Sequence, residues 1–324
     1  MNKSAKYFIL TELVLGILVA VLAALMLKGQ NKDTLGRVAV IVRDSDDSQW
    51  SAFKYGIRMA AQERGVEAVI IGTESVLTLE DQEELIQAEL ENGADAVIVQ
   101  PVPDEGAAQM LAKVRKKVPV MLVADQAPAD GKSSALPVTE PDPRALGTAL
   151  AEELLEDFRG NLEGKTMGII SRTTDSSTTA GRMEGFQETL EGTGIELLWC
   201  IAGNFDNGES EYLASQPKVD FIAALDDSSL TAAGEYASSN GLNGAVLYGI
   251  GHSTQAAYYL DKGIAECLVV PDEFSVGYQS MSEIADSLER LFHKAGSRTV
   301  SYTVLRRETL FSRKGQEILF TMSQ

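Results

Sequence analysis

The feature that most constrains the fold of this 324-residue chain is a series of short apolar runs, rich in β-branched residues and separated by segments with helical periodicity. Nearly continuous apolar strands are typical of parallel sheets, which are buried on both faces and whose strands are connected by helices. We therefore predict an α/β chain with doubly wound parallel sheets. The runs cover residues 37–43, 67–72, 95–100, 118–124, 166–171, 196–203, 219–225, 244–250 and 266–270.

A stretch rich in Pro, Ser, Ala and Asp at residues 127–143 divides these runs into four before it and five after it. The chain is also longer than a typical single domain, so two doubly wound lobes are predicted. Local signals agree with this division into helices and strands. Thr78 and Asp81 have the spacing of a capping box at a helix start, and Gly65 and Gly93 lie where helices are expected to end.

The N-terminal segment differs from the rest of the chain. Residues 7–27 are apolar apart from one charged residue, and about 20 apolar residues in a helix cross the hydrocarbon core of a bilayer. We predict one N-terminal transmembrane helix within residues 1–32. A cleavable signal peptide is the alternative, because Lys3 and Lys6 form a short basic segment before the apolar run. The length of that run favours an uncleaved anchor, with the body on the extracytoplasmic side of the cell membrane.

The charge balance excludes nucleic acid as a partner. The chain has 47 acidic and 28 basic side chains, a formal charge of −19, and no basic stripe along the sequence. Because residues 1–32 contribute +3, the remaining residues carry −22. Such an acidic body is expected to stay soluble and to avoid anionic lipid headgroups. Cys200 and Cys267 are too few for a disulfide framework, and no bond between them is expected.

The loops that follow the predicted strands are where a binding site is expected, because doubly wound sheets bind ligands at the carboxyl ends of their strands. These loops are rich in carboxylates, hydroxyls and carboxamides, with Arg43 and Arg172 the cations at the strand ends. Such acceptor-rich loops suit a ligand that donates many hydrogen bonds, such as a polyol, and Trp50 and Phe205 can cover the apolar face of a sugar ring. A solvated surface turn is the competing interpretation for any one of these residues.

Five segments together resemble the periplasmic sugar-binding proteins of the ribose-binding type, the solute receptors of ABC importers. The resemblance covers about residues 36–305 and implies the type I periplasmic binding protein fold, in which two lobes joined by three crossovers close on a ligand. It implies a first lobe of residues 36–138 plus 272–296 and a second lobe of residues 139–271 plus 297–324. The segments are RVAVIVR, DSDDSQW leading into FKYGIRMAAQERG, GADAVIVQPV, VPVMLVADQ and RMEGF at residues 182–186.

The family's ligand positions carry over to this chain in part. The first loop matches in place, and Phe205 aligns with an aromatic residue that stacks on the sugar. Elsewhere the pattern departs from the family: the carboxylate expected after GAVLYGI is Gly251, which His252 follows, so ribose itself is not implied. The ligand-binding residues predicted from the resemblance and from the strand ends are Asp47, Gln49, Trp50, Asp125, Gln126, Asp175, Phe205, Asp226, His252 and Asp272.

Motifs for catalysis and for metal or cofactor binding do not fit the sequence. GKT at residues 164–166 enters a strand instead of leaving one, and GIGHST at 249–254 lacks the third glycine of a dinucleotide fingerprint. The aspartates of residues 44–47 lack the glycine and the final glutamate of a calcium loop. We therefore expect no catalytic residues, no metal and no cofactor.

Two functions follow from these expectations. The first is a non-catalytic extracytoplasmic receptor that captures a sugar or related polyol between its lobes and delivers it to an ABC permease. The alternative is a membrane-tethered sensing module, of the same fold, that presents its closed form to a sensor kinase or a chemoreceptor.

Overall fold

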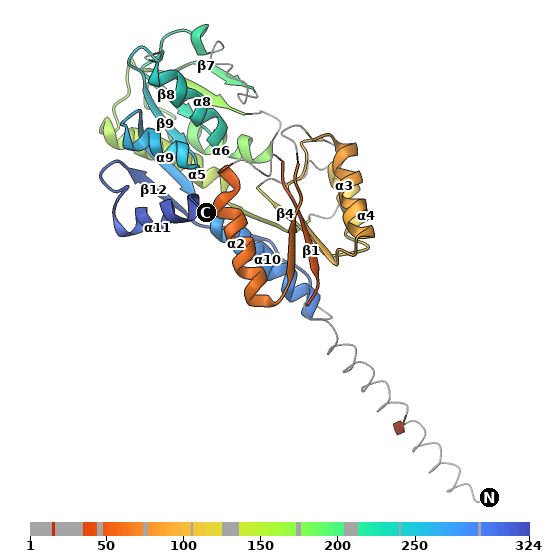
Figure 1. The fold of residues 1–324 in the computed structure, drawn as a ribbon. Coiled ribbons are helices and arrows are strands. Elements are labelled where there is room, and N and C mark those ends of the chain that lie inside the picture. The colour runs from red at the N-terminus through yellow and green to blue at the C-terminus, as the bar shows by residue number, and fades with distance from the viewer. Residues whose placement is uncertain are drawn as a thin grey trace, which may run out of the picture.

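The computed structural model describes residues 15–16, 35–43, 48–73, 77–104, 106–124, 136–172, 176–203, 213–239, 241–290 and 293–324. Within these residues the chain forms two α/β lobes, each built on a six-stranded sheet covered by helices (Figure 1). The predicted pair of parallel-sheet lobes is therefore confirmed.

The first lobe contains a parallel sheet in the order β11-β5-β4-β3-β1-β2. Helices α2 and α10 cover one face of this sheet, and α3 and α4 cover the other. The strands are β1 (Arg37–Ile41), β2 (Glu67–Ile70), β3 (Ala96–Val99), β4 (Val120–Val123), β5 (Val138–Pro141) and β11 (Arg298–Val300). The helices are η1 (Ser48–Trp50), α2 (Ser51–Arg64), α3 (Leu79–Glu91), α4 (Ala107–Val114) and α10 (Glu273–Glu289).

The second lobe contains a sheet in the order β12-β10-β9-β8-β6-β7, in which only β12 is antiparallel to its neighbour among the described pairs. Helices α5 and α6 cover one face, and α8, α9 and α11 lie on the other. The strands are β6 (Thr166–Ser171), β7 (Glu196–Ala202), β8 (Phe221–Ala224), β9 (Val246–Ile250), β10 (Ala265–Pro271) and β12 (Tyr302–Arg306). The helices are α5 (Pro143–Asp157), α6 (Ser177–Thr189), α8 (Asp227–Ser238), α9 (Thr254–Asp261) and α11 (Arg313–Met322).

The described chain passes between the two sheets at three places: after β5, after β10 and after β11. Strands β5 and β11 extend the first sheet a few residues beyond the predicted boundaries at residues 138 and 296. The second and third crossings are joined to each other, because the backbone N–H of Asp272 donates to the carbonyl oxygen of Ser301 at 3.0 Å. The lobes are thus connected through adjacent, hydrogen-bonded segments.

Each lobe has one close helix crossing that requires glycine. Helix α2 crosses α10 at Gly56 and Gly277, and helix α5 crosses α6 at Gly147 and Gly185. A Cβ atom built on any of these four glycines overlaps a backbone carbonyl oxygen of the opposite helix. Because α6 and α10 begin at the interface between the lobes, these crossings also fix where the N-termini of those helices lie.

Each of the nine predicted apolar runs coincides with a strand, so those expectations are confirmed. The predicted capping box is also present: the hydroxyl oxygen of Thr78 accepts from the Asp81 N–H at 3.1 Å, and the Asp81 carboxylate accepts from the Thr78 N–H at 3.0 Å. Gly65 ends α2 in the left-handed conformation, with φ of 64°. Cys200 and Cys267 are both free, on strands β7 and β10.

The predicted membrane segment, residues 7–27, lies outside the described residues except for Leu15 and Gly16. No helix within the part of the chain that the structure describes is both long enough and apolar enough to cross a bilayer.

Candidate ligand-binding cleft

A cavity of about 110 Å³ lies between the lobes, at the carboxyl ends of strands from both sheets. Both lobes contribute to its wall, and five helices or helical turns begin at or beside it: η1, α6, α8, α9 and α10. The described lining residues are Arg43, Gln49, Trp50, Gln100, Ala124, Glu140, Pro141, Arg172, Ser176, Thr178, Thr179, Arg182, Asp226, Asp227, Ser228, His252 and Glu273.

The structure brings four of the predicted ligand residues together at this cavity: Gln49, Trp50, Asp226 and His252. Asp272 lines a neighbouring cavity of about 370 Å³, which His252 and Glu273 also reach. The other predicted residues, which are Asp47, Asp125, Gln126, Asp175 and Phe205, lie outside the described residues.

Trp50 is held firmly in the first lobe. Its indole N–H donates to the carbonyl oxygen of Arg43 at 2.9 Å, and its ring meets Phe53 edge to face at 5.4 Å between centroids. Only 5% of the residue is exposed. The ring is therefore a fixed part of the cavity wall and belongs to the core of the lobe.

Asp226 and Asp227 organise the second lobe's edge of the cleft. The Asp226 carboxylate caps α8 by accepting from the Ser229 N–H at 2.9 Å, and it also accepts from the Arg172 N–H at 2.6 Å. Asp227 accepts from the N–H groups of His252 and Ser253 at 2.6 and 2.9 Å. These carboxylates compensate the positive end of the α8 dipole and join three strand-end loops.

Three of the described contacts cross the cleft directly. Nδ1 of His252 lies 3.1 Å from the carbonyl oxygen of Gln49. The Thr178 hydroxyl lies 3.3 Å from the carbonyl oxygen of Ala124 and 3.4 Å from the Glu140 carboxylate. Ala124 has φ of 62°, a conformation that a residue with a Cβ rarely adopts and that is often found at functional sites. These contacts hold the lobes in a closed arrangement.

Glu140 and Glu273 supply buried negative charge to the cavity, and each is only 7% exposed. One carboxylate oxygen of Glu273, Oε2, has no hydrogen-bond partner in the part of the chain that the structure describes. A buried carboxylate oxygen without a partner has a large desolvation cost. A hydroxyl-bearing ligand in this cavity would provide the missing donor.

Three arginines, Arg43, Arg172 and Arg182, line the same cavity, so the wall combines donors with acceptors. Arg182 is positioned by its Nη1, which donates to the carbonyl oxygen of Leu225 at 2.8 Å. Gln100 adds a carboxamide whose oxygen accepts from the Arg43 N–H at 3.1 Å. A wall of this composition can pair with the oxygens and the hydroxyl hydrogens of one small polar ligand.

Glu140, Arg182, Gln100 and Glu273 are not among the ligand residues predicted from the sequence. Glu273 follows Asp272 in the strand-end loop PDEF, and the prediction names only the first of these two carboxylates. In the structure Asp272 instead caps α10, because it accepts from the Ser275 N–H at 3.0 Å. Glu140 lies in β5 just before the first crossover, and Arg182 belongs to the matched segment RMEGF. The available signal was a charged residue beside a predicted crossover or within a matched helix start.

The model of the periplasmic binding protein domain family matches residues 38–290, which is most of the chain. The chain therefore belongs to the periplasmic binding protein family, whose members are extracytoplasmic, non-enzymatic solute receptors. No curated protein matches the chain by sequence.

Solved structures of solute-binding proteins share the fold. A carbohydrate transporter solute-binding protein from Agrobacterium radiobacter, in complex with D-arabinose, is 17% identical with a TM-score of 0.76, over 88% of this chain and 98% of that one. A Bacillus halodurans solute-binding protein with bound myo-inositol is 17% identical, with a TM-score of 0.74 over 90% and 99%. A glucose-galactose binding protein from Geobacillus stearothermophilus is 18% identical, with a TM-score of 0.72 over 85% and 99%.

Proposed function

We propose that this receptor captures a sugar or a related polyol between its lobes and delivers it to an ABC importer. The observation that carries the proposal is the inter-lobe cavity, in which arginines, buried carboxylates and strand-end polar groups of both lobes face one small space. A polyol offers both donors and acceptors around its perimeter, which matches this mixed wall. The solved relatives bound to D-arabinose and to myo-inositol support the same class of ligand.

Closure is the step that makes binding useful. A ligand that contacts both lobes stabilises the closed arrangement more than the open one, and this difference drives the change of shape. In this chain the first lobe would contribute Gln49, Trp50 and Glu140, and the second lobe would contribute Asp226 and His252. We propose that the other predicted ligand residues, Asp47, Asp125, Gln126, Asp175, Phe205 and Asp272, complete or flank this shell.

Calorimetry of residues 33–324 against a panel of pentoses, hexoses and inositols tests the ligand class. We expect binding of at least one member, with closure visible as a smaller radius of gyration in small-angle scattering. No binding by any member would contradict the carbohydrate assignment. The double substitution Trp50→Ala with Phe205→Ala is expected to abolish that binding, and retained affinity would show that the ligand lies elsewhere.

The alternative role is a sensor that presents the closed form to a kinase or a chemoreceptor. The predicted uncleaved anchor, residues 7–27, favours this alternative because it keeps the receptor at the membrane. Deleting the gene separates the two roles. Loss of uptake of the radiolabelled ligand supports the importer, whereas normal uptake with loss of the transcriptional or motile response to the ligand supports the sensor.

We also propose that residues 7–27 tether the receptor to the membrane with the lobes outside. Their apolar sequence supports this, as does the direction of β1, whose carboxyl end lies at the cleft and whose first residue therefore lies at the opposite end of the first lobe. Extraction of cell membranes with alkaline carbonate, followed by mass spectrometry of the N-terminus, tests the tether. A mature chain that begins after residue 27 would contradict it.

A further inference from the structure

A groove of about 690 Å³ lies on the first lobe, at the amino ends of its strands and therefore opposite the ligand cleft. It is bounded by the turn after α4, by the residues before β4 and β5, and by the segment between α10 and β11. We call it the basal groove and define it by Arg115, Lys116, Lys117, Pro119, His293 and Lys294.

The basal groove is basic although the chain is strongly acidic. Four cationic side chains line it, and none of the described residues in its wall carries a carboxylate. Lys116, Lys117 and Lys294 are all exposed. Basic residues just after α4 interact favourably with the negative end of its helix dipole. This explains Lys116 and Lys117 but not Lys294. Lys294 comes from a different segment and converges on the same groove.

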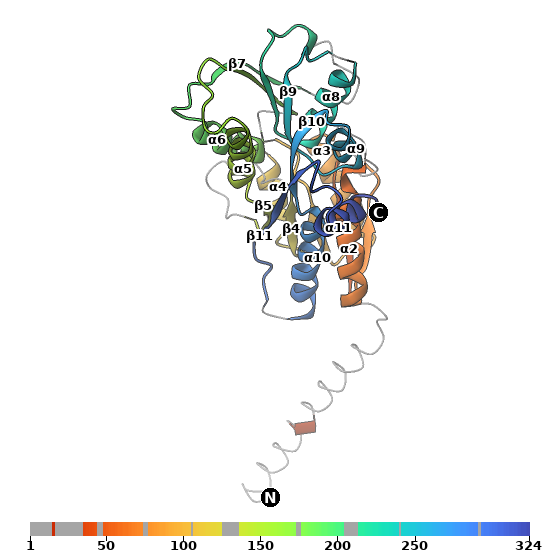
Figure 2. The ribbon, with the colours of Figure 1, turned by 90° about the vertical axis from the view of Figure 1, so that its left-hand side faces the viewer.

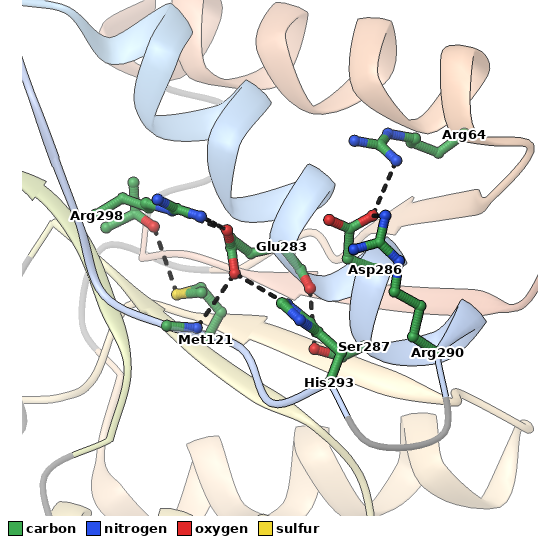
Figure 3. Close-up of polar contacts among 10 residues, drawn as sticks. Arg64, Met121, Glu283, Asp286, Ser287, Arg290, His293 and Arg298 are labelled. Carbon is green, nitrogen blue, oxygen red and sulfur yellow. Dashed lines mark hydrogen bonds and ion pairs between the residues drawn. The ribbon is translucent and has the colours of Figure 1, made fainter.

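A buried carboxylate holds that second segment in place. Glu283 of α10 accepts from Nε of Arg298 at 2.8 Å and from the Gly296 N–H at 3.2 Å, and Nε2 of His293 lies 3.4 Å from it. Figure 3 shows Glu283 between Arg298 and His293. Because residues on both sides of Lys294 are bound to one carboxylate, the segment that carries Lys294 has a defined position beside the turn after α4.

The start of β1 lies at the same end of the first lobe as the groove, where the strands of the sheet begin. Leu35 precedes β1, and its N–H donates to the carbonyl oxygen of Gly65 at 2.6 Å. The groove lies at the amino ends of β4 and β5. These strands are two and three places from β1 in the sheet, which is roughly 10–14 Å at the usual strand spacing. Residues 28–34 can span at most about 25 Å. Figure 2 shows α2 and α10 side by side, with the C-termini of both helices at this end of the first lobe. A chain tethered through residues 7–27 would therefore keep this end close to the bilayer.

We propose that the basal groove binds the headgroups of anionic phospholipids and so sets the orientation of the tethered receptor. The inference rests on the proposed membrane tether. Lysines near a membrane surface are attracted to anionic lipid within about a Debye length, which is roughly 8–10 Å at physiological ionic strength. A linker that spans at most about 25 Å lets the groove come within that distance of the bilayer. The acidic remainder of the body is repelled by the same lipid. Attraction at one face and repulsion elsewhere favour a receptor that stands on the base of its first lobe.

The full chain, reconstituted in nanodiscs, tests the proposal through the rate at which each lysine is acetylated by a water-soluble ester. We expect Lys116, Lys117 and Lys294 to react at least fivefold more slowly in discs with 30% phosphatidylglycerol than in discs of phosphatidylcholine alone. Lys218 and Lys262, which are exposed on the second lobe, are internal controls and should react at the same rate in both. Half-molar NaCl should remove the protection.

Paired variants sharpen the test. Lys116→Glu with Lys117→Glu should restore the reactivity of Lys294 in phosphatidylglycerol discs. The matched pair Lys218→Glu with Lys262→Glu makes the same change in net charge on the second lobe and should leave Lys294 protected. Unchanged melting temperatures would show that neither pair disturbs the fold.

Three outcomes would overturn the proposal, and they are distinguishable. Equal reactivity of the groove lysines in both kinds of disc contradicts headgroup binding while leaving the tether intact. Protection by 20 mM glycerol phosphate in phosphatidylcholine discs indicates a site for free anions instead of a membrane surface. Failure of the chain to float with phosphatidylcholine vesicles contradicts the tether, and the orientation inferred from it falls as well.

Discussion

Nδ1 of His252, in the second lobe, lies 3.1 Å from the backbone carbonyl oxygen of Gln49 in the first lobe. For this carbonyl to accept a hydrogen bond, Nδ1 must carry a hydrogen, so the contact selects one tautomer of the neutral imidazole or requires the protonated ring. Both residues line the cavity between the lobes. The contact therefore stabilises the closed arrangement directly, in addition to any contact that a ligand makes with the two lobes.

Substituting His252 by Ala should weaken ligand binding by up to about tenfold, because one net hydrogen bond of about 0.5–1.5 kcal/mol is lost from the closed form only. Calorimetry measures the change in Kd, and small-angle scattering should show a more open unliganded receptor. Tyr258→Phe, on the exposed face of α9, is the matched control. Equal affinities for wild type and His252→Ala would show that this contact does not contribute to closure.

Glu273→Gln should have opposite effects on stability and on affinity. Oε2 of Glu273 is buried without a described partner, so neutralising it should leave the unliganded melting temperature unchanged or raise it. Affinity should fall by roughly 10-fold to 100-fold, because a hydrogen bond to a charged acceptor contributes about 1.5–3 kcal/mol. Thermal melting and calorimetry on one preparation measure both quantities.

The neighbouring Asp272 provides the contrast. Asp272→Ala removes the cap of α10 and should lower the free energy of unfolding by about 1 kcal/mol, with a smaller effect on Kd than Glu273→Gln. If Asp272→Ala has the larger effect on Kd, the ligand extends into the neighbouring cavity.

Glu283→Gln should lower stability in a manner that depends on pH. Burial alone would raise the pKa of Glu283, but the hydrogen bonds from Arg298, Gly296 and His293 outweigh it and hold the pKa below its usual 4.5. The carboxylate therefore stabilises the fold above about pH 4.5, and this contribution is lost as the pH falls through the lowered pKa. We expect a deficit of about 1–3 kcal/mol at pH 7 that shrinks in acid.

Urea denaturation at several pH values measures this dependence. Glu289→Gln, on the exposed end of the same helix, is the control and should change stability little at any pH. A deficit for Glu283→Gln that does not vary between pH 7 and pH 3.5 would contradict the assigned role of the carboxylate.

Gly56→Ala should destabilise the first lobe, although the same substitution in an open helix is stabilising by about 1 kcal/mol. The added Cβ overlaps the carbonyl oxygen of Phe274, so α2 and α10 must separate, at a cost of about 1–3 kcal/mol. Gly72→Ala meets no atom within 4 Å and serves as the control. A Gly56→Ala protein as stable as wild type would mean that the crossing of α2 and α10 has room for a Cβ atom.

The sequence predicted the strands well because their signal is local. A run such as residues 95–100 is apolar throughout, and burial on both faces of a parallel sheet demands that composition. The capping box at Thr78 and Asp81 was predictable for the same reason, since both partners lie within one turn. Strands β5, β11 and β12 were not among the predicted runs, because they are short or polar and owe their pairing to strands far away in the sequence.

The candidate site was predicted less completely, for a related reason. Gln49, Trp50, Asp226 and His252 lie in the segments that follow β1, β8 and β9, and the rule for strand ends locates such residues. Glu273 differs from the selected Asp272 by one position, and only the path of the first turn of α10 determines which carboxylate caps the helix and which faces the cavity. The basal groove draws on segments more than 170 residues apart in sequence. The basic run KVRKK at residues 113–117 is a local signal, but only the fold brings Lys294 next to it.

The three crossings between the lobes limit how this receptor can move. Two bodies joined by one strand can rotate about it, tilt and slide, but adjacent connections, two of them hydrogen-bonded through Asp272 and Ser301, oppose all of these motions except a bend. Opening is then described by a single angle. Occupancy of the cleft then changes the value of that angle. A partner at the membrane can distinguish the occupied from the empty receptor by this angle alone, whatever the chemical identity of the solute.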